Sequence, residues 1–241
     1  MTLRCFTCLL LFISAATLPA QTIFQQNFEV PGIPSGWTVQ SSATDGGWLV
    51  GTPGALSSQF FGIPSNGSQR IAATNDDKCN CNKSQEYLIT PLIDLSAAVQ
   101  PVLKADILFG GESYQGATEQ GTILASLDKT NWTPLNNLSG HDGWQTIVTD
   151  LSAFAGKTVY IAFRYGDGNG WLYGMAVDNV LVEEPANLDA ALTNLSGRAF
   201  GEENVALPIS GSIFNNGVMA ITELELRYTV NGGAPVTETF S

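Results

Sequence analysis

The chain has 241 residues and carries 22 acidic against 10 basic side chains, a formal net charge of −12. Proteins that bind nucleic acid need a basic surface to meet the phosphates, so this charge argues against nucleic acid as a partner. The length allows one large β-domain or two smaller domains. An acidic surface also suits a soluble extracellular protein and favours divalent cations.

Residues 1–20 have the pattern of a secretory signal peptide. Arg4 supplies the positive start, residues 5–13 (CFTCLLLFI) form an apolar core, and residues 18–20 precede a plausible cleavage site before Gln21. The apolar stretch is too short to span a bilayer. We therefore expect a secreted or cell-surface protein without a transmembrane segment; an uncleaved N-terminal anchor is the alternative.

Two cysteines, Cys79 and Cys81, remain after the signal peptide is removed. With His141 as the single histidine, they are too few to build a zinc site. An oxidising compartment favours a local disulfide between Cys79 and Cys81. Two reduced thiols in a loop are the alternative.

Short strand-like runs recur between clusters of Gly, Asn, Asp, Ser and Pro, and little of the chain looks helical. In chain order we expect strands at residues 22–28, 47–50, 69–74, 86–90, 101–109, 121–126, 144–149, 157–165 and 175–182. Many short strands with regular turn signals predict an all-β fold, specifically a jelly-roll β-sandwich of residues 21–184.

The composition changes near Pro185, and a proline at this point is typical of a linker between domains. Beyond it, strand-like runs at residues 188–192, 205–214, 224–230 and 235–240 predict the start of an immunoglobulin-like β-sandwich. Such a domain needs about 100 residues. We therefore expect residues 185–241 to be an incomplete immunoglobulin-like domain of a truncated chain; a small cap on the first domain is the alternative.

Asp178 lies within the apolar run 175–182 (MAVDNVLV). Strict strand alternation puts Ala176, Asp178, Val180 and Val182 on one face. A carboxylate on an apolar face is costly unless it is paired, hydrogen-bonded or bound to a metal. Asp178 is therefore either a metal ligand or an acceptor of backbone N–H groups.

Nine short motifs occur in a recognisable order and spacing: residues 24–29 (FQQNFE), 33–37 (IPSGW), 47–48 (GW), 74–77 (TNDD), 87–96 (YLITPLIDLS), 126–132 (SLDKTNW), 150–152 (DLS), 159–165 (VYIAFRY) and 177–180 (VDNV). Together they resemble the cleaved-adhesin or choice-of-anchor J domain of secreted Bacteroidetes proteins, a MAM-like and gingipain-adhesin-like domain. The resemblance implies a jelly roll with structural calcium. It also implies adhesion or substrate binding on large secreted or cell-surface proteins.

Calcium takes several oxygen ligands, and the candidates are Glu29, Asn75, Asp76, Asp77 and Asp178. First and last strands of a jelly roll commonly lie side by side, which would let Glu29 and Asp178 meet. Similar domains place calcium near equivalent motif positions, so we expect a structural Ca²⁺ held by these residues. The alternative is that Asp76 and Asp77 form a solvated turn.

Aromatic side chains suggest ligand contacts, because flat rings stack on sugars. Trp171 and Tyr173 follow the Gly/Asn loop 166–170 and are the tentative ligand-binding residues; core or rim packing is the alternative. Loop 166–170 itself is either a cation loop or an ordinary Asx turn. Residues 126–132 resemble an Asp-box hairpin, in which Asp128 accepts hydrogen bonds from turn amides.

No nucleophile elbow, metalloprotease helix or phosphate-binding Gly loop occurs in the sequence, so we do not expect an enzyme. The predicted function is a non-catalytic extracellular binding or adhesion module of a multidomain protein. Its expected partners are a host or matrix protein or a glycan. One alternative is a carbohydrate-binding accessory domain of a larger secreted hydrolase or peptidase, and another is a structural spacer.

Overall fold

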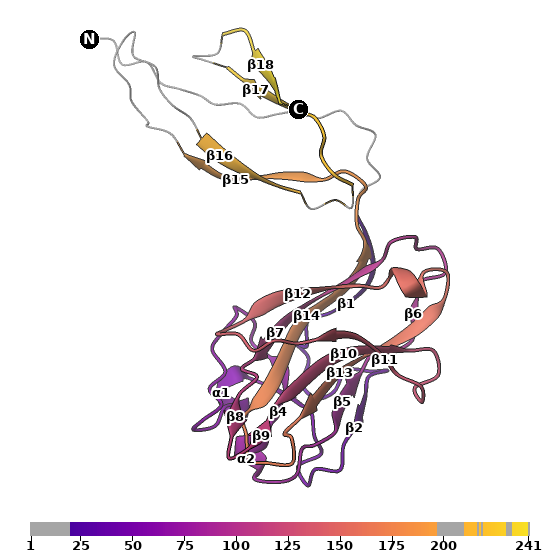
Figure 1. Ribbon diagram of the computed structural model, residues 1–241, viewed down its shortest axis with the longest axis vertical. Helices are drawn as coiled ribbons and strands as arrows, with labels where there is room; N and C mark the ends of the chain where they lie inside the picture. Colours follow the sequence, from indigo (N-terminus) through magenta and orange to yellow (C-terminus); the bar gives the residue numbers. More distant parts are fainter. Residues whose placement is uncertain (1–19, 197–209, 216, 218, 230–232, 241) are drawn as a thin grey trace, which may run out of the picture. The chain divides into compact units, whose positions relative to one another are not determined.

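The computed structural model describes residues 20–196, 210–215, 217, 219–229 and 233–240, so the signal peptide predicted for residues 1–20 lies almost wholly outside the described residues. The chain divides into two compact units, Gln21–Glu184 and a unit that contains Pro185–Ser241 (Figure 1). Within the described residues no helix is long and apolar enough to cross a membrane.

The unit Gln21–Glu184 is a β-sandwich of two antiparallel sheets. The first sheet has the order β12-β7-β14-β4-β3, with β1 also paired to β14. It comprises β1 (Gln21–Gln26), β3 (Leu49–Gly51), β4 (Ile71–Asn75), β7 (Val102–Phe109), β12 (Gln145–Asp150) and β14 (Gly174–Glu184).

The second sheet has the order β11-β10-β13-β5-β2, with β6 also paired to β13. It comprises β2 (Thr38–Gln40), β5 (Glu86–Ile89), β6 (Ile93–Asp94), β10 (Gln120–Ser126), β11 (Thr133–Asn137) and β13 (Thr158–Gly166). The remaining elements of this unit are short: α1 (Pro53–Leu56), α2 (Asp76–Cys79), the 3₁₀ turn Ser152–Phe154 and the small hairpin of β8 (Ser113–Tyr114) and β9 (Ala117–Thr118).

The main core lies between the two sheets because every second side chain of a strand points inward. Leu103, Ala105 and Ile107 of β7 face this core, as do Ile161 and Phe163 of β13. Two smaller clusters cover the outer faces of the sheets. One surrounds Ile71 and Ala176 on the first sheet, and the other surrounds Ile89 and Ala162 on the second.

The all-β sandwich expected from the sequence is confirmed, and each of the nine strands predicted before residue 185 overlaps an observed strand. Five short strands were missed: β2, β6, β8, β9 and β11. Of these, β2 and β6 have three and two residues. The Asn75–Asp77 segment, expected as a loop, forms the beginning of α2 with Asn75 as the N-cap.

The prediction that Ala176, Asp178, Val180 and Val182 share one face of β14 is wrong. The pairing of β14 with β7 shifts register between Asp178 and Leu181, and Asn179 has a φ of 48°. This bulge reverses the alternation of side chains. Val180 and Val182 therefore face the main core, whereas Ala176 lies in the outer cluster, and Asp178, two residues on, points to the same outer face.

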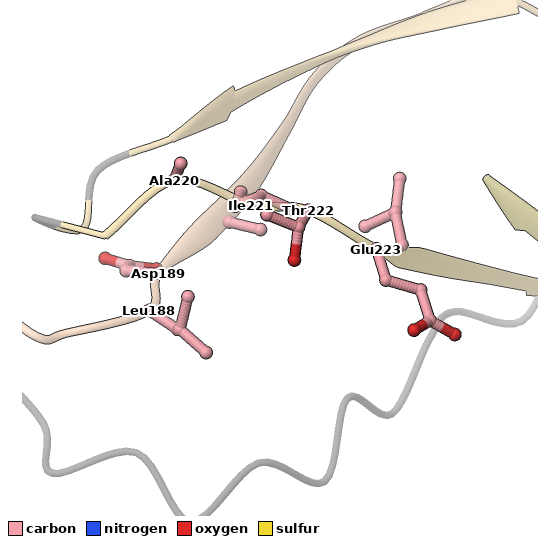
Figure 2. A pocket seen from close by; sticks show the side chains of 8 residues that line it. Leu188, Asp189, Ala220, Ile221, Thr222 and Glu223 are labelled. Atoms are coloured by element: carbon pink, nitrogen blue, oxygen red, sulfur yellow. The ribbon is translucent and has the colours of Figure 1, made fainter. Parts of the chain in front are cut away.

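The described part of residues 185–241 also contains antiparallel strand pairs, and its assignment to an immunoglobulin-like domain stays a prediction. β15 (Ala190–Ser196) pairs with β16 (Ser210–Asn215), and β17 (Leu224–Tyr228) pairs with β18 (Val236–Phe240). Predicted residues 205–209 lie outside the described residues. Figure 2 shows side chains that line a pocket between Leu188–Ala190 and the segment 220–224. Its lining is mostly exposed, and we assign it no ligand.

Candidate functional site

Glu29 and Asp178 meet the same short loop, residues 66–69 (NGSQ). β1 pairs with β14, as expected for the first and last strands of a jelly roll. An oxygen of Glu29 accepts a hydrogen bond from the backbone N–H of Gln69 at 2.9 Å. Asp178 is fully buried, and its Oδ2 accepts from the amide of Asn66 at 2.7 Å. Its Oδ1 accepts from the N–H of Asn179 at 2.8 Å.

The electrostatic state of Asp178 follows from this burial. Burial raises the pKa of Asp178, and the nearby carboxylate of Asp106 acts in the same direction. Hydrogen bonds from Asn66, Ser68 and the N–H of Asn179 oppose this rise by stabilising the ionised form. A cation beside Asp178 would favour the ionised form in the same way.

Asn75, Asp76 and Asp77 lie in a different place. Asn75 pairs with Gly174, four residues before Asp178 on β14, so the two positions are on the order of 13 Å apart along the strand. The structure therefore does not bring the five predicted calcium ligands into one site. Spacing along the sequence could not reveal this, because the β4–β14 register sets the separation.

The three residues at the start of α2 organise the neighbouring loops. The side-chain oxygen of Asn75 caps the helix by accepting from the N–H of Lys78 at 2.9 Å. Asp76 accepts from the N–H of Leu172 at 2.6 Å, and Asp77 accepts from the N–H of Phe60 at 3.1 Å. The two carboxylates thus fix the backbones of two different loops. Burial raises the pKa of Asp76 to about 6.

Glu119 is a buried carboxylate that the sequence reading missed. Its Oε1 accepts hydrogen bonds from the Tyr165 hydroxyl at 2.8 Å and from the N–H groups of Tyr173 and Gly174 at 3.0 and 2.8 Å. Its Oε2 accepts from the N–H of Glu112 at 3.0 Å. Burial raises the pKa of Glu119, against these hydrogen bonds. Because the donors come from distant segments, no local motif pointed to it.

A second unpredicted polar cluster surrounds Lys83, whose side chain is fully buried. Its ammonium group pairs with Asp45 at 2.8 Å and donates to the carbonyl of Gly47 at 3.3 Å. Glu86 is buried beside it and lacks a hydrogen bond of ordinary geometry; burial raises its pKa. Gly47 has a φ of +86°, and a Cβ there would stand 2.4 Å from the Glu86 carboxylate.

Cys79 and Cys81 are joined by a disulfide in the structure, with their Cα atoms 5.1 Å apart. The bridge encloses Asn80, which ends α2 in the left-handed conformation. The sulfurs lie within 4.8 Å of a carboxylate oxygen of Asp45. Bonded sulfurs are not thiolates and do not supply metal ligands here.

Of the two tentative ligand-binding residues, Trp171 is half exposed, at 50%. It meets Phe60, which is 56% exposed, with ring centroids 6.2 Å apart in an edge-to-face arrangement. Tyr173 is half-buried and packs against the outer cluster of the first sheet. Trp37 and Trp48 are core residues, in line with the packing alternative.

The two turn motifs are structural. Asp128 accepts from the N–H groups of Thr130 and Asn131, each at 2.8 Å, as expected for an Asp-box hairpin, and these bonds hold its pKa below the usual range. Asp167 is buried and accepts from the N–H of Asn169 at 2.7 Å, which is an Asx turn. Its second oxygen accepts from the N–H of Lys83 at 2.7 Å.

Comparisons with known proteins agree with the fold. No protein-family model matches the chain. Hemagglutinin A of Porphyromonas gingivalis is 24% identical over 213 residues, which cover 76% of this chain and only 8% of that protein. The chain therefore spans less than a tenth of its curated relative.

Two solved adhesin domains of Lys-gingipain from P. gingivalis W83 are also similar. The K3 cleaved adhesin domain aligns with a TM-score of 0.50 and 21% identity, covering 68% of this chain and 98% of that domain. The K1 domain aligns with a TM-score of 0.49 and 21% identity, covering 66% and 96%. The resemblance to gingipain-type adhesin domains drawn from the sequence motifs is thereby confirmed.

Proposed function

We propose that the chain is a non-catalytic binding module of the adhesin type, carried by a secreted or cell-surface protein. The observation that carries the proposal is the exposed pair Trp171 and Phe60. Each side chain is an apolar ring that is about half exposed to solvent in the folded protein. The backbones of both segments are fixed by hydrogen bonds. Exposed aromatic side chains on fixed loops are common anchors in binding surfaces.

The way these loops are held supports recognition by a preformed surface. Asp76 binds the N–H of Leu172, and Glu119 binds those of Tyr173 and Gly174, so the backbone just after Trp171 is fixed on two sides. Asp77 does the same for Phe60. A preorganised surface loses less conformational entropy on binding. These acids therefore serve to position loops, in keeping with a binding role.

The proposal is tested by screening the full chain against glycan and matrix-protein arrays, followed by titration of each hit. Trp171→Ala should weaken binding of the ligand at least about tenfold, as for an interface anchor. The matched control is Phe214→Ala, which removes an exposed aromatic side chain of β16 that belongs to neither proposed binding surface. Absence of any ligand on both arrays would favour a structural spacer.

We further propose one structural Ca²⁺ site, formed by Glu29, Asp178 and the loop 66–69. Carboxylates and backbone carbonyls of a tight loop are ligands that calcium prefers. The support is the convergence of Glu29 and Asp178 on this loop, together with the full burial of Asp178. A bound cation would offset the cost of burying this carboxylate and tie the first strand to the last.

A carbohydrate-binding accessory role within a larger secreted hydrolase or peptidase is the second candidate. It is favoured by the aromatic rings Tyr87, Trp132 and Tyr160, which are half-buried on the outer face of the second sheet. A hydrolase or peptidase domain encoded in the same reading frame would support this role over adhesion.

A further inference from the structure

The outer face of the second sheet carries a row of side chains, one from each of five neighbouring strands. The strand registers place Gln40 of β2 opposite Tyr87 of β5, and Tyr87 opposite Arg164 of β13. They also place Arg164 opposite Thr122 of β10, and Thr122 opposite Asn137 of β11. The adjacent residues Leu88, Phe163 and Ile123 face the core, so this row faces outward.

Next to this row lies an aromatic layer. Tyr87, Trp132 and Tyr160 pack on Ile89, Leu124 and Ala162, which are buried beneath them. The ring centroids of Tyr87 and Trp132 are 6.2 Å apart, and their planes are inclined by 35°. The three aromatic side chains are only partly buried, so part of each remains open to a ligand.

Two cationic side chains lie over the rings of Tyr87 and Tyr160. The Arg164 guanidinium lies 5.9 Å from the centre of the Tyr87 ring, and the Lys129 ammonium lies 4.5 Å from that of Tyr160. Among the described residues neither cation forms an ion pair, and the buried Nε of Arg164 has no hydrogen-bond partner. Arg164 therefore retains donors that an incoming anion can use.

Charged side chains are unevenly distributed over this face. No outward-facing residue of β2, β5, β10, β11 or β13 is acidic, although the chain has 22 acidic and 10 basic residues. Glu86 of β5 is buried on the core side, whereas Asp94 of the short strand β6 and Asp128 of the Asp-box turn are exposed carboxylates outside the row. An anionic ligand that lies along the row thus meets the Arg164 guanidinium without an acidic side chain in the row.

We propose that this aromatic-basic face, defined by Tyr87, Thr122, Lys129, Trp132 and Arg164, binds an acidic polysaccharide built from uronic-acid sugars. Sugar rings stack on Tyr87 and Trp132, and the sugar carboxylate accepts hydrogen bonds from Arg164. Thr122, with the neighbouring amides Gln40 and Asn137, supplies hydrogen bonds for sugar hydroxyls. The inference rests on the proposed binding role but uses residues other than Trp171 and Phe60.

A glycan fits this face better than a protein partner. A protein interface buries about 800 Å² on each side around large apolar anchors. Here the rings are recessed beside hydroxyl and amide side chains, in a strip of one sheet. Polar groups flanking flat rings match the alternation of hydroxyls and apolar ring faces on a sugar.

The test measures binding of the full chain to polygalacturonate and to the same polymer after complete methyl esterification, which keeps the sugar rings and removes their charge. We expect binding to polygalacturonate, weaker binding to the ester, and loss of affinity as salt is raised. Arg164→Gln should reduce the affinity for polygalacturonate about tenfold, since it removes a charge-assisted hydrogen bond. Lys129→Gln should reduce it less.

Lys157→Gln is the matched control, because it removes one exposed lysine whose ammonium group contacts the carbonyl of Ala153 and the ring of Phe154, and none of the residues that define the face. Its affinity, and that of Trp171→Ala, should equal that of the unchanged chain. The inference would be overturned if the chain did not bind polygalacturonate, or if it bound the methyl ester equally well. It would also be overturned if Arg164→Gln and Lys157→Gln lowered the affinity for polygalacturonate equally. Trp171-dependent binding of another ligand would meanwhile leave the proposed function intact.

Discussion

At the scale of single residues, the buried carboxylates decide how this sandwich presents its loops. Glu119 collects four donors from three segments, and Asp76 holds the N–H of Leu172. Ionised acceptors form the stronger class of hydrogen bonds, which offsets much of the cost of burying their charge. Asp178 has fewer donors than Glu119, and it converges with Glu29 on the loop 66–69, which is why a calcium site is proposed there.

Replacing Glu119 tests the first of these roles. Glu119→Gln keeps the size of the side chain but turns two acceptor oxygens into one oxygen and one NH₂ group, which faces a donor. We expect the free energy of unfolding to fall by about 3 kcal/mol. Urea denaturation measures this loss, with the exposed Glu112→Gln as control. If Glu119→Gln lowered the free energy of unfolding by less than the control variant, a structural role for Glu119 would be refuted.

Asp76 should make stability depend on pH. Its pKa in the folded protein is about 6, raised from 3.8 mainly by burial, so the fold prefers the protonated form. The stabilisation from this proton is complete below pH 3.8 and is lost as the pH rises to about 6. Comparing melting temperatures of the wild type and Asp76→Asn across this range, in chelator, isolates the effect. If the melting temperatures of the two proteins changed with pH in the same way, the predicted contribution of Asp76 would be contradicted.

At the scale of elements, the bulge in β14 is the feature that local pattern could not predict. Asn179 adopts a left-handed conformation and donates from its amide to Asp106 at 2.8 Å. The extra residue turns Val180 and Val182 into the core and leaves Asp178 on the outer face. Asn is among the few residues that tolerate positive φ, which is the signal that was present in the sequence.

Substitutions at Asn179 test this bulge. Asn179→Val places a β-branched side chain at positive φ and removes the bond to Asp106, so we expect a loss of about 2 kcal/mol in unfolding free energy. Asn179→Gly keeps the backbone freedom and should cost less than Asn179→Val. Chemical denaturation compares the two. Equal losses would show that the side-chain hydrogen bond, and not the backbone, dominates.

At the scale of the whole molecule, the proposed calcium closes the sandwich by joining the end of β1 to β14 through the loop 66–69. Calcium at 100 times its Kd would stabilise the folded state by about 2.7 kcal/mol. Melting in calcium and in chelator should therefore differ for the wild type and coincide for Asp178→Asn. The exposed Asp142→Asn should keep the shift. An unchanged wild-type melting temperature in chelator would remove the calcium proposal.

The disulfide is tested on the secreted protein by intact mass before and after reduction. A bridge between Cys79 and Cys81 predicts a gain of two hydrogen masses on reduction and resistance to alkylation beforehand. Two alkylated cysteines in the untreated protein would contradict it. Reduction should loosen the end of α2 and leave the strand core intact, since the bridge encloses only Asn80.

The sequence by itself determined the sandwich class, the positions of the nine main strands and the Asp-box turn, and it left loop 166–170 open between a cation loop and an Asx turn. These follow from local alternation and turn chemistry, which each segment carries within itself, whereas the pairing of the first and last strands was expected from the jelly-roll topology. The sequence also singled out Asp178 and Trp171, the one as a charge in an apolar run and the other as a ring beside a loop.

Only the tertiary structure decided which of these residues meet. Strand register separates Asp178 from Asn75 and lines up Gln40, Tyr87, Arg164, Thr122 and Asn137 from five strands. The local sequences around Glu119 and Lys83 contain no motif that marks these residues as special. They are buried and form several hydrogen bonds because backbone segments distant in sequence pack around them. Such contacts depend on register and on the β14 bulge. A one-residue shift in either would move every later side chain to the opposite face.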